Sequence, residues 1–390
     1  APPLFLCIFV SLIMSSTKLF AFGNPLLDIS AEVKPELLAK YSLQADNAIL
    51  AEAGKHESLF AELVADYPVE YVPGGSALNT ARVTQFFSLP SPTSAGTVAY
   101  LGSASDDKFG STLREKAESE GLHVELALDT TKSTGKCAAL VTGGKRSLVA
   151  DLQAAESFSA VRGDTKSVDT VLGGAKKWFE EASVFYTTSF VLTHSAEAAT
   201  TLAAECARTD KTFVMNLSAP FLLEVPPFFA SVKGLLPYAD YVFCNDSEAA
   251  SLIKAMGWPE GDLEGAATKL ATYEKVNKKQ ERTVIFTCGG SPAIVAKGAA
   301  PVSKHAPIAL AAGQLVDENG AGDAYLGGFL AALVDNKSTE ECFALAAYAA
   351  YVVIQQHGCK LVAPEELPTI THNEVAFPPA HVVAAKRQKV

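Results

Sequence analysis

The residues with the clearest chemical potential form the stretch Gly320-Ala321-Gly322-Asp323, where a loop is expected to turn into a helix. Small residues let the backbone approach a ligand closely, and the unpaired amides of a helix start attract an anion. A carboxylate beside such an anion hole is where phosphoryl transfer needs a base for the attacking hydroxyl. We therefore predict Gly320, Ala321, Gly322 and Asp323 to be catalytic. The alternative is that Asp323 only stabilises the helix dipole.

A second candidate is the stretch Gly74-Gly75-Ser76-Ala77-Leu78-Asn79, which follows an apolar run and opens a helix. The two glycines would let a hydroxylated ligand lie against the backbone, with the Asn79 amide as donor and acceptor. Alternatively, they form a tight turn with Ser76 as the N-cap.

The third candidate is Asn24-Pro25-Leu26-Leu27-Asp28, which follows the first expected strand. Its carboxylate, Asp28, could accept hydrogen bonds from two hydroxyls of a sugar. The alternative is an Asn-Pro turn with a satisfied loop carboxylate.

The fourth candidate, Asn245-Asp246-Ser247-Glu248, also follows an expected strand. Asn245 and Glu248 carry oxygen ligands of the kind that reach Mg²⁺ through water. Alternatively, Asp246 or Ser247 caps the following helix. The sequence has no P-loop, H-E-x-x-H or kinase H-R-D motif, which argues against those classes of enzyme.

Composition narrows the function further. A formal charge of -11 repels both a nucleic acid backbone and an anionic lipid surface, so we expect neither as a partner. Hydrophobic residues make up 48% of the chain, which predicts a folded protein. The 7 cysteines show no C-x-x-C spacing, so we expect a reducing, cytoplasmic location.

The elements that must position these residues alternate along the chain. Short apolar runs followed by amphipathic stretches are typical of parallel strands joined by helical crossovers, so the predicted fold class is α/β. The expected strands are Leu19–Phe22, Ser183–Thr187, Thr212–Asn216, Tyr241–Cys244 and Thr283–Thr287. The expected helices are Val168–Glu181, Ala196–Ala207, Glu248–Met256, Asp323–Val334 and Thr339–Gln356, the last with Gly358 as its C-cap.

Other regions depart from this alternation. Residues 29–73 and 137–152 have the pattern of antiparallel strands, and we expect them to form one small β-rich lid. Residues 1–17 are expected to be a leader outside the fold, because their apolar run is shorter than the roughly 20 residues of a spanning helix. A signal anchor is the alternative. Residues 18–364 would form the main domain and residues 365–390 a peripheral tail.

Two of these motifs carry a resemblance to a known family. Gly74-Gly75-x-x-x-Asn79 and Gly320-Ala321-Gly322-Asp323, in this order, resemble the motifs of the ribokinase-like (PfkB) carbohydrate kinases. Within the family, the chain is most similar to members that act on adenosine, in Asn24–Ser30, Lys40–Leu43, Asn216–Phe221 and Asn319–Ala324. The resemblance covers about Lys18 to Leu361.

The resemblance implies a ribokinase-like three-layer α/β/α core with a mainly parallel sheet, plus the small lid domain. It also implies transfer of the γ-phosphoryl group of ATP to the 5′-hydroxyl of adenosine with Mg²⁺. The products would be AMP and ADP, as in purine salvage. We expect a monomer whose partners are adenosine and ATP.

The resemblance further implies a role for each matching residue. Asp323 would be the base, and the Gly320–Gly322 amides would stabilise the charge on the phosphoryl oxygens. The residues implied to hold adenosine are Asn24, Leu26, Asp28, Leu50, Gly74, Gly75, Ser76, Asn79, Leu148, Ala150, Leu152 and Phe190, with Phe190 stacking on adenine. The residues implied to meet ATP are Arg146, Asn216, Asn245, Glu248, Thr287, Gly289 and Gly290, of which Asn245 and Glu248 would also reach Mg²⁺, through water.

Two departures from the family pattern stand out. Glu318 occupies a position where the family commonly has Thr, and Asp151 one where some relatives carry Asn. We expect Glu318 to point to solvent, because a carboxylate facing the phosphates would weaken ATP binding. Two alternatives stay open: a ribokinase-like kinase of a sugar or another nucleoside, and a nucleoside-binding protein without catalysis.

Overall fold

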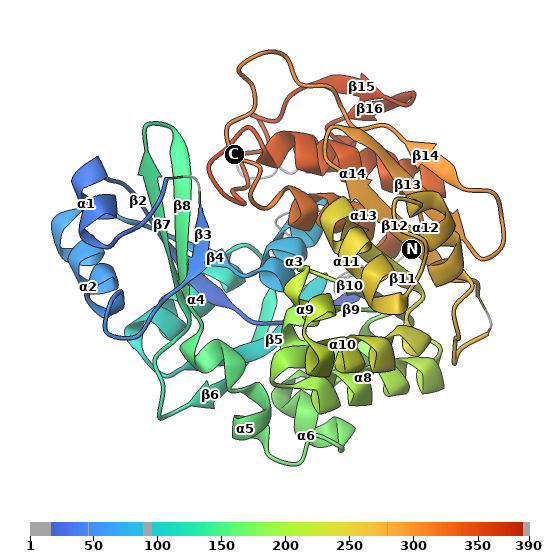
Figure 1. The fold of residues 1–390 in the computed structure, drawn as a ribbon, viewed down its shortest axis with the longest axis horizontal. Coiled ribbons are helices and arrows are strands. Elements are labelled where there is room, and N and C mark those ends of the chain that lie inside the picture. The colour runs from blue at the N-terminus through green and yellow to red at the C-terminus, as the bar shows by residue number, and fades with distance from the viewer. Residues whose placement is uncertain (1–16, 46, 89–95, 279, 385–390) are drawn as a thin grey trace, which may run out of the picture.

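The computed structural model describes residues 17–45, 47–88, 96–278 and 280–384. In these ranges the chain builds a large β-sheet with helices on both faces and a separate small β-sheet beside it (Figure 1). The expected leader, apart from its last position, lies outside the described residues. No helix in the described ranges is both long and apolar enough to cross a membrane.

The large sheet has nine strands in the order β14-β13-β12-β11-β10-β9-β1-β5-β6. Neighbours from β12 to β6 pair in parallel, whereas β13 and β14 pair antiparallel. The strands are β1 (Leu19–Phe22), β5 (Val98–Ser105), β6 (His123–Asp129), β9 (Val184–Thr188), β10 (Thr212–Asn216), β11 (Tyr241–Asn245), β12 (Thr283–Cys288), β13 (Ser291–Lys297) and β14 (Ser303–His305). The five strands predicted from the sequence all belong to this sheet.

Both faces of the large sheet are buried. In β1, Leu19 and Ala21 pack into one core while Phe20 and Phe22 pack into the other, which explains the unbroken apolar run. The helices on the first face are α3 (Ser76–Phe87), α4 (Lys108–Ser119), α13 (Ala321–Val334) and α14 (Thr339–Val353). Those on the second face are α5 (Phe158–Arg162), α6 (Val168–Leu172), α7 (Lys176–Glu181), α8 (Ala196–Thr209), α9 (Phe221–Glu224), α10 (Pro226–Leu235), α11 (Asp246–Met256) and α12 (Leu263–Ala271). The predicted three-layer α/β fold is confirmed.

Two helix predictions were wrong in detail. The helix expected over residues 168–181 is divided into α6 and α7, because Gly173 adopts a φ of +51° and a 3-10 turn replaces the α-helix there. Helix α14 ends at Val353 with Ile354 as its C-cap, and Gly358 instead lies in the loop beyond it. The backbone amide of Gly358 donates to Asp317 Oδ2 at 2.8 Å, so this glycine serves a different part of the structure.

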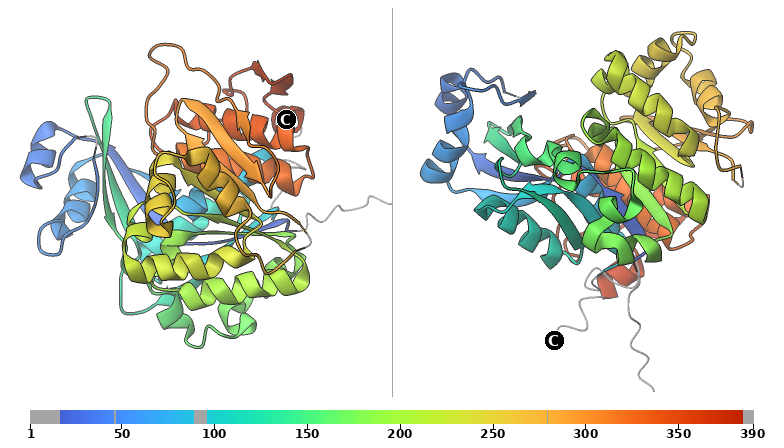
Figure 2. Two further views of the ribbon diagram at one scale, coloured as in Figure 1. Left: turned by 45° about the vertical axis from the view of Figure 1, so that its right-hand side comes forward. Right: turned by 90° about the horizontal axis from the view of Figure 1, so that it is seen from below.

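The small sheet has the order β3-β8-β7-β2-β4 and stands away from the large one (Figure 2). Its strands are β2 (Leu26–Glu32), β3 (Ala48–Leu50), β4 (Glu70–Gly74), β7 (Lys136–Thr142) and β8 (Lys145–Asp151), with α1 (Pro35–Lys40) and α2 (Glu57–Asp66) packed on it. The expectation of purely antiparallel strands was wrong, because β2 pairs with β7, and β3 with β8, in parallel. Strands β2 and β7 both begin next to the large sheet and therefore run in the same direction.

The segment after residue 365 is less peripheral than the sequence predicts. It forms the hairpin β15 (Ile370–His372) and β16 (Val375–Phe377) and the short helix α15 (Ala380–Ala384). Phe377 is buried and stacks on Tyr348 of α14, with ring centroids 4.6 Å apart. Val382 is also buried in the same core, so this segment contributes to the packing of α14.

Candidate active site

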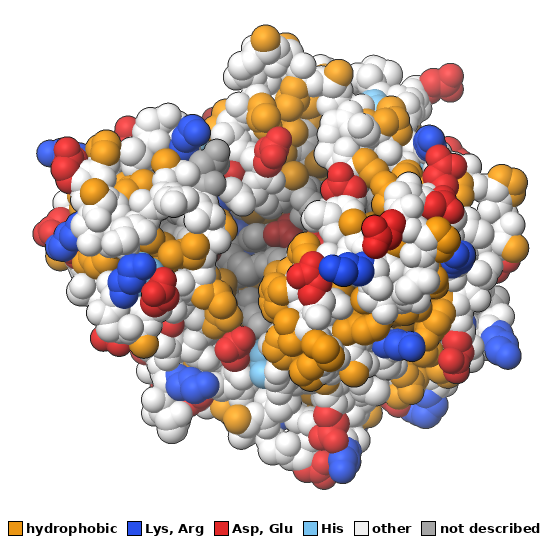
Figure 3. Space-filling view, in the orientation of Figure 1, with side chains coloured by type: hydrophobic (Ala, Val, Ile, Leu, Met, Phe, Trp, Pro, Cys, Tyr) orange, Lys and Arg blue, Asp and Glu red, His pale blue; other side chains and the backbone are white. Residues whose placement is uncertain are grey.

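The polar residues singled out by the sequence meet at one edge of the large sheet. Asn24 follows β1, and Asn216 and Asn245 end β10 and β11. Because these strands are parallel, their carboxyl ends share one edge, where α/β proteins bind ligands. Figure 3 shows a hollow there, between the small sheet and the helices α9 to α11.

Asp323 lies in the first turn of α13. Gly320, with a φ of +87°, is the N-cap, and a Cβ on Gly322 would meet no atom within 4 Å. The sequence predicts that the Ala321 amide is available to an anion. In the structure this amide instead donates to the Glu318 carbonyl at 3.1 Å, so that part of the prediction was wrong. Among the described residues, no group accepts from the amides of Gly322 and Asp323. These two amides form the candidate anion hole.

The carboxylate of Asp323 is held by the second glycine-rich motif. Ser76 Oγ donates to Asp323 Oδ1 at 2.6 Å, and Asn79 Nδ2 donates to Asp323 Oδ2 at 3.0 Å. Gly75, not Ser76, is the N-cap of α3, so the capping role considered for Ser76 was wrong. The structure thus joins two motifs that lie far apart in the sequence.

Asp323 is poised for proton transfer. Burial raises the pKa of its carboxyl group to about 6, while the hydrogen bonds from Ser76 and Asn79 lower it and the charge of Asp28 raises it. A carboxylate with a pKa near neutral is suited to general base catalysis.

Asp28 lies on β2 beneath the Gly74-Gly75 turn. A Cβ on Gly74 would lie 2.4 Å from Asp28 Oδ1, so the first glycine makes room for this carboxylate. Gly75 has a φ of +90°, and a Cβ there would lie 2.2 Å from the Asn24 carbonyl oxygen. Burial raises the pKa of Asp28, and the charges of Arg146 and Arg82 oppose the rise. Asp28, Gly74, Gly75 and Asn24 therefore form one compact group.

Arg146, on β8 of the small sheet, reaches across to this group. Its Nη2 lies 3.2 Å from Asp28 Oδ2, and its Nη1 lies 3.4 Å from Asp317 Oδ2. Sequence reasoning missed Asp317, which also accepts from the Gly358 amide and from Asn319. The available signal in the sequence was its place three residues before Gly320, at the start of the glycine-rich turn.

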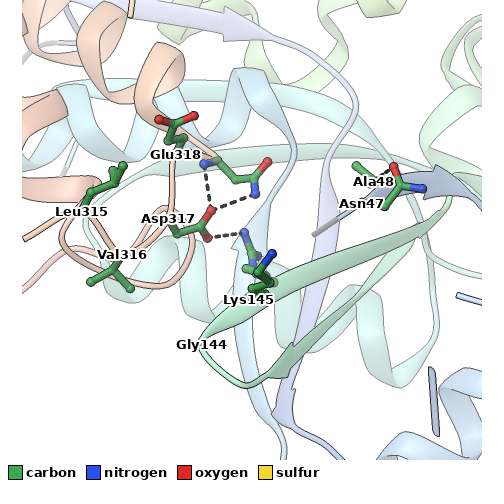
Figure 4. Close-up of a pocket in the computed structure, with 10 residues that line it drawn as sticks. Asn47, Ala48, Gly144, Lys145, Leu315, Val316, Asp317 and Glu318 are labelled. Carbon is green, nitrogen blue, oxygen red and sulfur yellow. Dashed lines mark hydrogen bonds and ion pairs between the residues drawn. The ribbon is translucent and has the colours of Figure 1, made fainter. Parts of the chain in front are cut away.

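A pocket of about 550 Å³ lies between the β7–β8 hairpin and the loop that leads to α13 (Figure 4). Its lining includes Arg146, Asp317 and Glu318. Glu318 is exposed, and its carboxylate points away from Asp317, which is consistent with the expected solvent-facing position.

The residues of the predicted apolar slot lie on strands of the small sheet or, for Leu152, directly after one. Leu148 and Ala150 of β8 pair with Ala48 and Leu50 of β3, and Leu50 is 62% exposed. Leu26 and Leu152 both approach Gly135, where a Cβ would lie 2.8 Å from Leu26 Cδ2 and 2.7 Å from the Leu152 carbonyl oxygen.

On the opposite side of the hollow lies an aromatic cluster. The ring centroid of Phe190, in the 3-10 turn after β9, is 6.3 Å from that of Phe221, which in turn is 6.2 Å from Phe228. Figure 3 shows hydrophobic side chains gathered over α9 and α10 at this rim. Phe221 is 44% exposed, so an aromatic ligand would find a ready surface here.

The residues expected to meet ATP lie along the adjacent part of the edge. Asn245 and Thr287 are register partners in β11 and β12, and Gly289 and Gly290 follow in a turn with open space around both. Asn216 Oδ1, at the end of β10, accepts from the Ser218 amide at 3.1 Å.

Asn245 and Glu248 form a capping box for α11. Asn245 Oδ1 accepts from the Glu248 amide at 2.8 Å, and a Glu248 carboxylate oxygen accepts from the Asn245 amide at 3.0 Å. Asn245 is therefore the N-cap, in place of the Asp246 or Ser247 considered from the sequence. Burial raises the pKa of Glu248 to about 7, and the nearby charge of Asp323 adds to the rise. The described chain has no group of three His, Cys, Asp or Glu side chains arranged to hold a metal ion.

Comparison with known proteins gives a consistent picture. Residues 44–366 match the sequence profile described as pfkB family carbohydrate kinase. The chain is 40% identical over 344 residues to "Adenosine kinase 2" of Arabidopsis thaliana, which covers 87% of this chain and 94% of the relative.

Solved structures agree. Anopheles gambiae adenosine kinase, solved in complex with P1,P4-di(adenosine-5) tetraphosphate, is 37% identical with a TM-score of 0.76, covering 88% of this chain and 97% of that one. Trypanosoma brucei brucei adenosine kinase without ligand is 32% identical with a TM-score of 0.80, covering 87% and 99%.

Proposed function

The chain belongs to the pfkB family of carbohydrate kinases, and we propose that it phosphorylates the 5′-hydroxyl of adenosine with ATP, giving AMP and ADP. The observation that carries the proposal is the carboxylate of Asp323, held beside two unpaired amides at the start of α13. The adenosine kinases among its relatives identify the acceptor.

Asp323 acts as the general base. As the 5′-oxygen of adenosine attacks the γ-phosphorus, its proton passes to the Asp323 carboxylate and the bond to the β-phosphate oxygen breaks, releasing ADP. A pKa of about 6 keeps this carboxylate deprotonated at neutral pH yet basic enough to take the proton. Ser76 and Asn79 fix its orientation, and the amides of Gly322 and Asp323 stabilise the charge on the transferred phosphoryl group.

The nucleoside lies in the hollow with its two ends recognised differently. Asp28 accepts hydrogen bonds from the ribose hydroxyls, which approach over Gly74 and Gly75. The adenine ring lies between the Phe190 cluster and the leucines of the small sheet. This division is supported by the buried carboxylate on β2 and by the exposed Leu50 and Phe221.

The residues present fit Mg²⁺. Asn245 and Glu248 offer oxygen atoms, the ligands that this ion prefers, and the nearby carboxylate of Asp323 adds negative charge to the same part of the site. Both would hold the ion through water, and Arg146 would add positive charge on the small-sheet side. When bound, the ion neutralises the charge of the ATP phosphates.

We further propose a reducing, cytoplasmic setting. The six cysteines in the described chain are all free thiols, and burial raises the pKa of Cys137, Cys244 and Cys359 among them. Thiols of this kind are protonated and unreactive.

The test is an ADP-release assay with Mg-ATP and adenosine, inosine or ribose, with the Asp323→Asn variant as the control for contaminating activity. The expected result is AMP from adenosine at a kcat/KM well above that for the other two. Faster turnover of ribose would indicate a sugar kinase. Adenosine binding without ADP release would indicate a binding protein.

A further inference from the structure

A histidine that the sequence does not single out meets a predicted adenosine residue. His194 is the C-cap of the 3-10 turn that carries Phe190, and its Nε2 lies 3.0 Å from Asn24 Oδ1. The contact joins the loops that follow β9 and β1, which are neighbouring parallel strands. It therefore ties the adenine side of the hollow to the ribose side.

The hydrogen-bond network fixes which atom donates. The Ser195 hydroxyl is buried and accepts from the Ser159 amide at 3.2 Å, and among the described residues the acceptor within reach of its own proton is His194 Nδ1 at 2.8 Å, so the hydroxyl donates to Nδ1. A neutral imidazole carries one proton, so Nδ1 accepts and Nε2–H donates. Burial lowers the pKa of His194 to about 4, with a further contribution from the charge of Lys132, so the ring is neutral at pH 7.

This donor determines the orientation of the Asn24 amide. Because Nε2–H needs an acceptor, the amide turns its oxygen to the histidine and its Nδ2 away from it. Among the described residues, no group accepts a hydrogen bond from Nδ2. The Asn24 backbone carbonyl lies close to Gly75, so Asn24 is a neighbour of the turn where the nucleoside is proposed to bind.

We infer that His194 is a positioning residue, which holds Asn24 so that its Nδ2 donates to a hydrogen-bond acceptor atom of the nucleoside. The inference deepens the proposed function and rests on it. Without the histidine, the two amide orientations of Asn24 become nearly equivalent, and part of the binding free energy is lost in ordering the side chain. His194 thus acts on affinity for the nucleoside through Asn24, without touching the transferred phosphoryl group.

The test is calorimetric titration of the full-length protein with adenosine in the absence of ATP. The His194→Leu variant should bind adenosine about three- to tenfold more weakly, the range expected for one lost hydrogen bond. The His194→Gln variant, whose side-chain amide can donate to Asn24 Oδ1, should stay within about twofold of the parent. At saturating adenosine, kcat should be little changed in both variants.

A double-mutant cycle separates this role from a merely structural one. If His194 acts through Asn24, then His194→Leu should cause no further loss of binding in an Asn24→Ala background. The His372→Leu variant, which removes a histidine contact to the Ala306 carbonyl in the β15 hairpin, is the matched control and should bind adenosine normally. Melting temperatures of all variants check the fold.

Additive losses in the cycle, or a His194→Gln variant as weak as His194→Leu, would overturn the inference and leave the proposed function intact. A parent protein that binds no adenosine would instead refute the proposed function, and this inference with it.

Discussion

Arg146 Nη2 lies 3.2 Å from Asp28 Oδ2, so the cation proposed to meet the phosphates of ATP is ion-paired with the carboxylate proposed to hold the ribose. Both side chains are largely buried, with 8% and 18% of their side-chain surface exposed. Ribose hydroxyls that donate to Asp28 would weaken this pair and free Arg146 for the phosphates. The two substrates should therefore bind cooperatively.

The first prediction is that a non-hydrolysable ATP analogue with Mg²⁺ strengthens adenosine binding at least about fivefold, a typical size for such coupling. In the Arg146→Gln variant the strengthening should largely disappear, because the group that links the two sites is gone. Calorimetry with each ligand alone and with both measures the effect. Equal coupling in parent and variant would exclude Arg146 as the link.

The second prediction concerns the base. Asp323→Asn should lower kcat by at least about a hundredfold, because a lost general base typically costs 10² to 10⁴ in rate, while adenosine affinity changes little. Steady-state kinetics and calorimetry measure the two quantities. Glu318→Gln removes a neighbouring but exposed carboxylate and serves as the matched control. If kcat of the Asp323→Asn variant stays within fivefold of the parent value, Asp323 is not the general base.

The third prediction is the pH dependence of kcat/KM. A base works only when deprotonated, so activity should fall as the pH drops below about 6, the pKa of Asp323 in the free protein. Ser76→Ala removes a hydrogen bond that stabilises the charged form, so this acid limb should move to higher pH.

Glu248 is a second group that titrates nearby, with a pKa of about 7. In the Glu248→Gln variant the limb near pH 6 should stay. Its loss in that variant, or an unmoved limb in Ser76→Ala, would assign the limb to a group other than Asp323.

The fourth prediction tests Asp28. Asp28→Ala should weaken adenosine binding by about 1.5 to 3 kcal/mol, the range for hydrogen bonds to a charged group. The loss should be smaller for 2′,3′-dideoxyadenosine, which lacks the hydroxyls that Asp28 would hold. Calorimetry with both nucleosides gives the comparison, and equal losses would contradict the assigned contact.

The fifth prediction concerns the small sheet as a lid. Adenosine should slow amide hydrogen exchange in residues 29–73 and 137–152 and around Phe190, because closure would cover the exposed Leu50 and the Phe221 rim. The hairpin β15–β16, which lies in another part of the molecule, should show no change. Protection spread evenly over the chain would argue against a closing lid.

The local pattern of apolar residues and glycines in the sequence was sufficient to predict many of the strands and turns of this fold. The strand Leu19–Phe22 was predicted to the residue, because a strand buried on both faces is an unbroken apolar run, which here is bounded by Lys18 and Gly23. The glycine motifs were located correctly because glycine has a distinct role where φ is positive, as at Gly75 and Gly320.

The partners of the site residues could not be predicted in this way. Arg82, for example, donates hydrogen bonds to the Pro73 and Cys359 carbonyls and to the Glu120 carboxylate. The sequence of a helix does not indicate which of its arginines will bind carbonyls from distant parts of the chain. Likewise, the pairing of Asn79 with Asp323 depends on how α3 and α13 pack. Such contacts arise only from the tertiary arrangement.

The parallel pairing of β2 with β7 also governs the order in which the molecule can assemble during synthesis. The ladder joins Leu27 to Lys136, so β2 leaves the ribosome with β4 as its nearest partner and keeps its other edge open until β7 follows. Strands β9 to β12 are, by contrast, neighbours in both sequence and space and can add one after another. In the half of the protein made last, the strands that pair are therefore closer in sequence and can find each other sooner. The small sheet is the part most exposed to wrong pairing with another nascent chain.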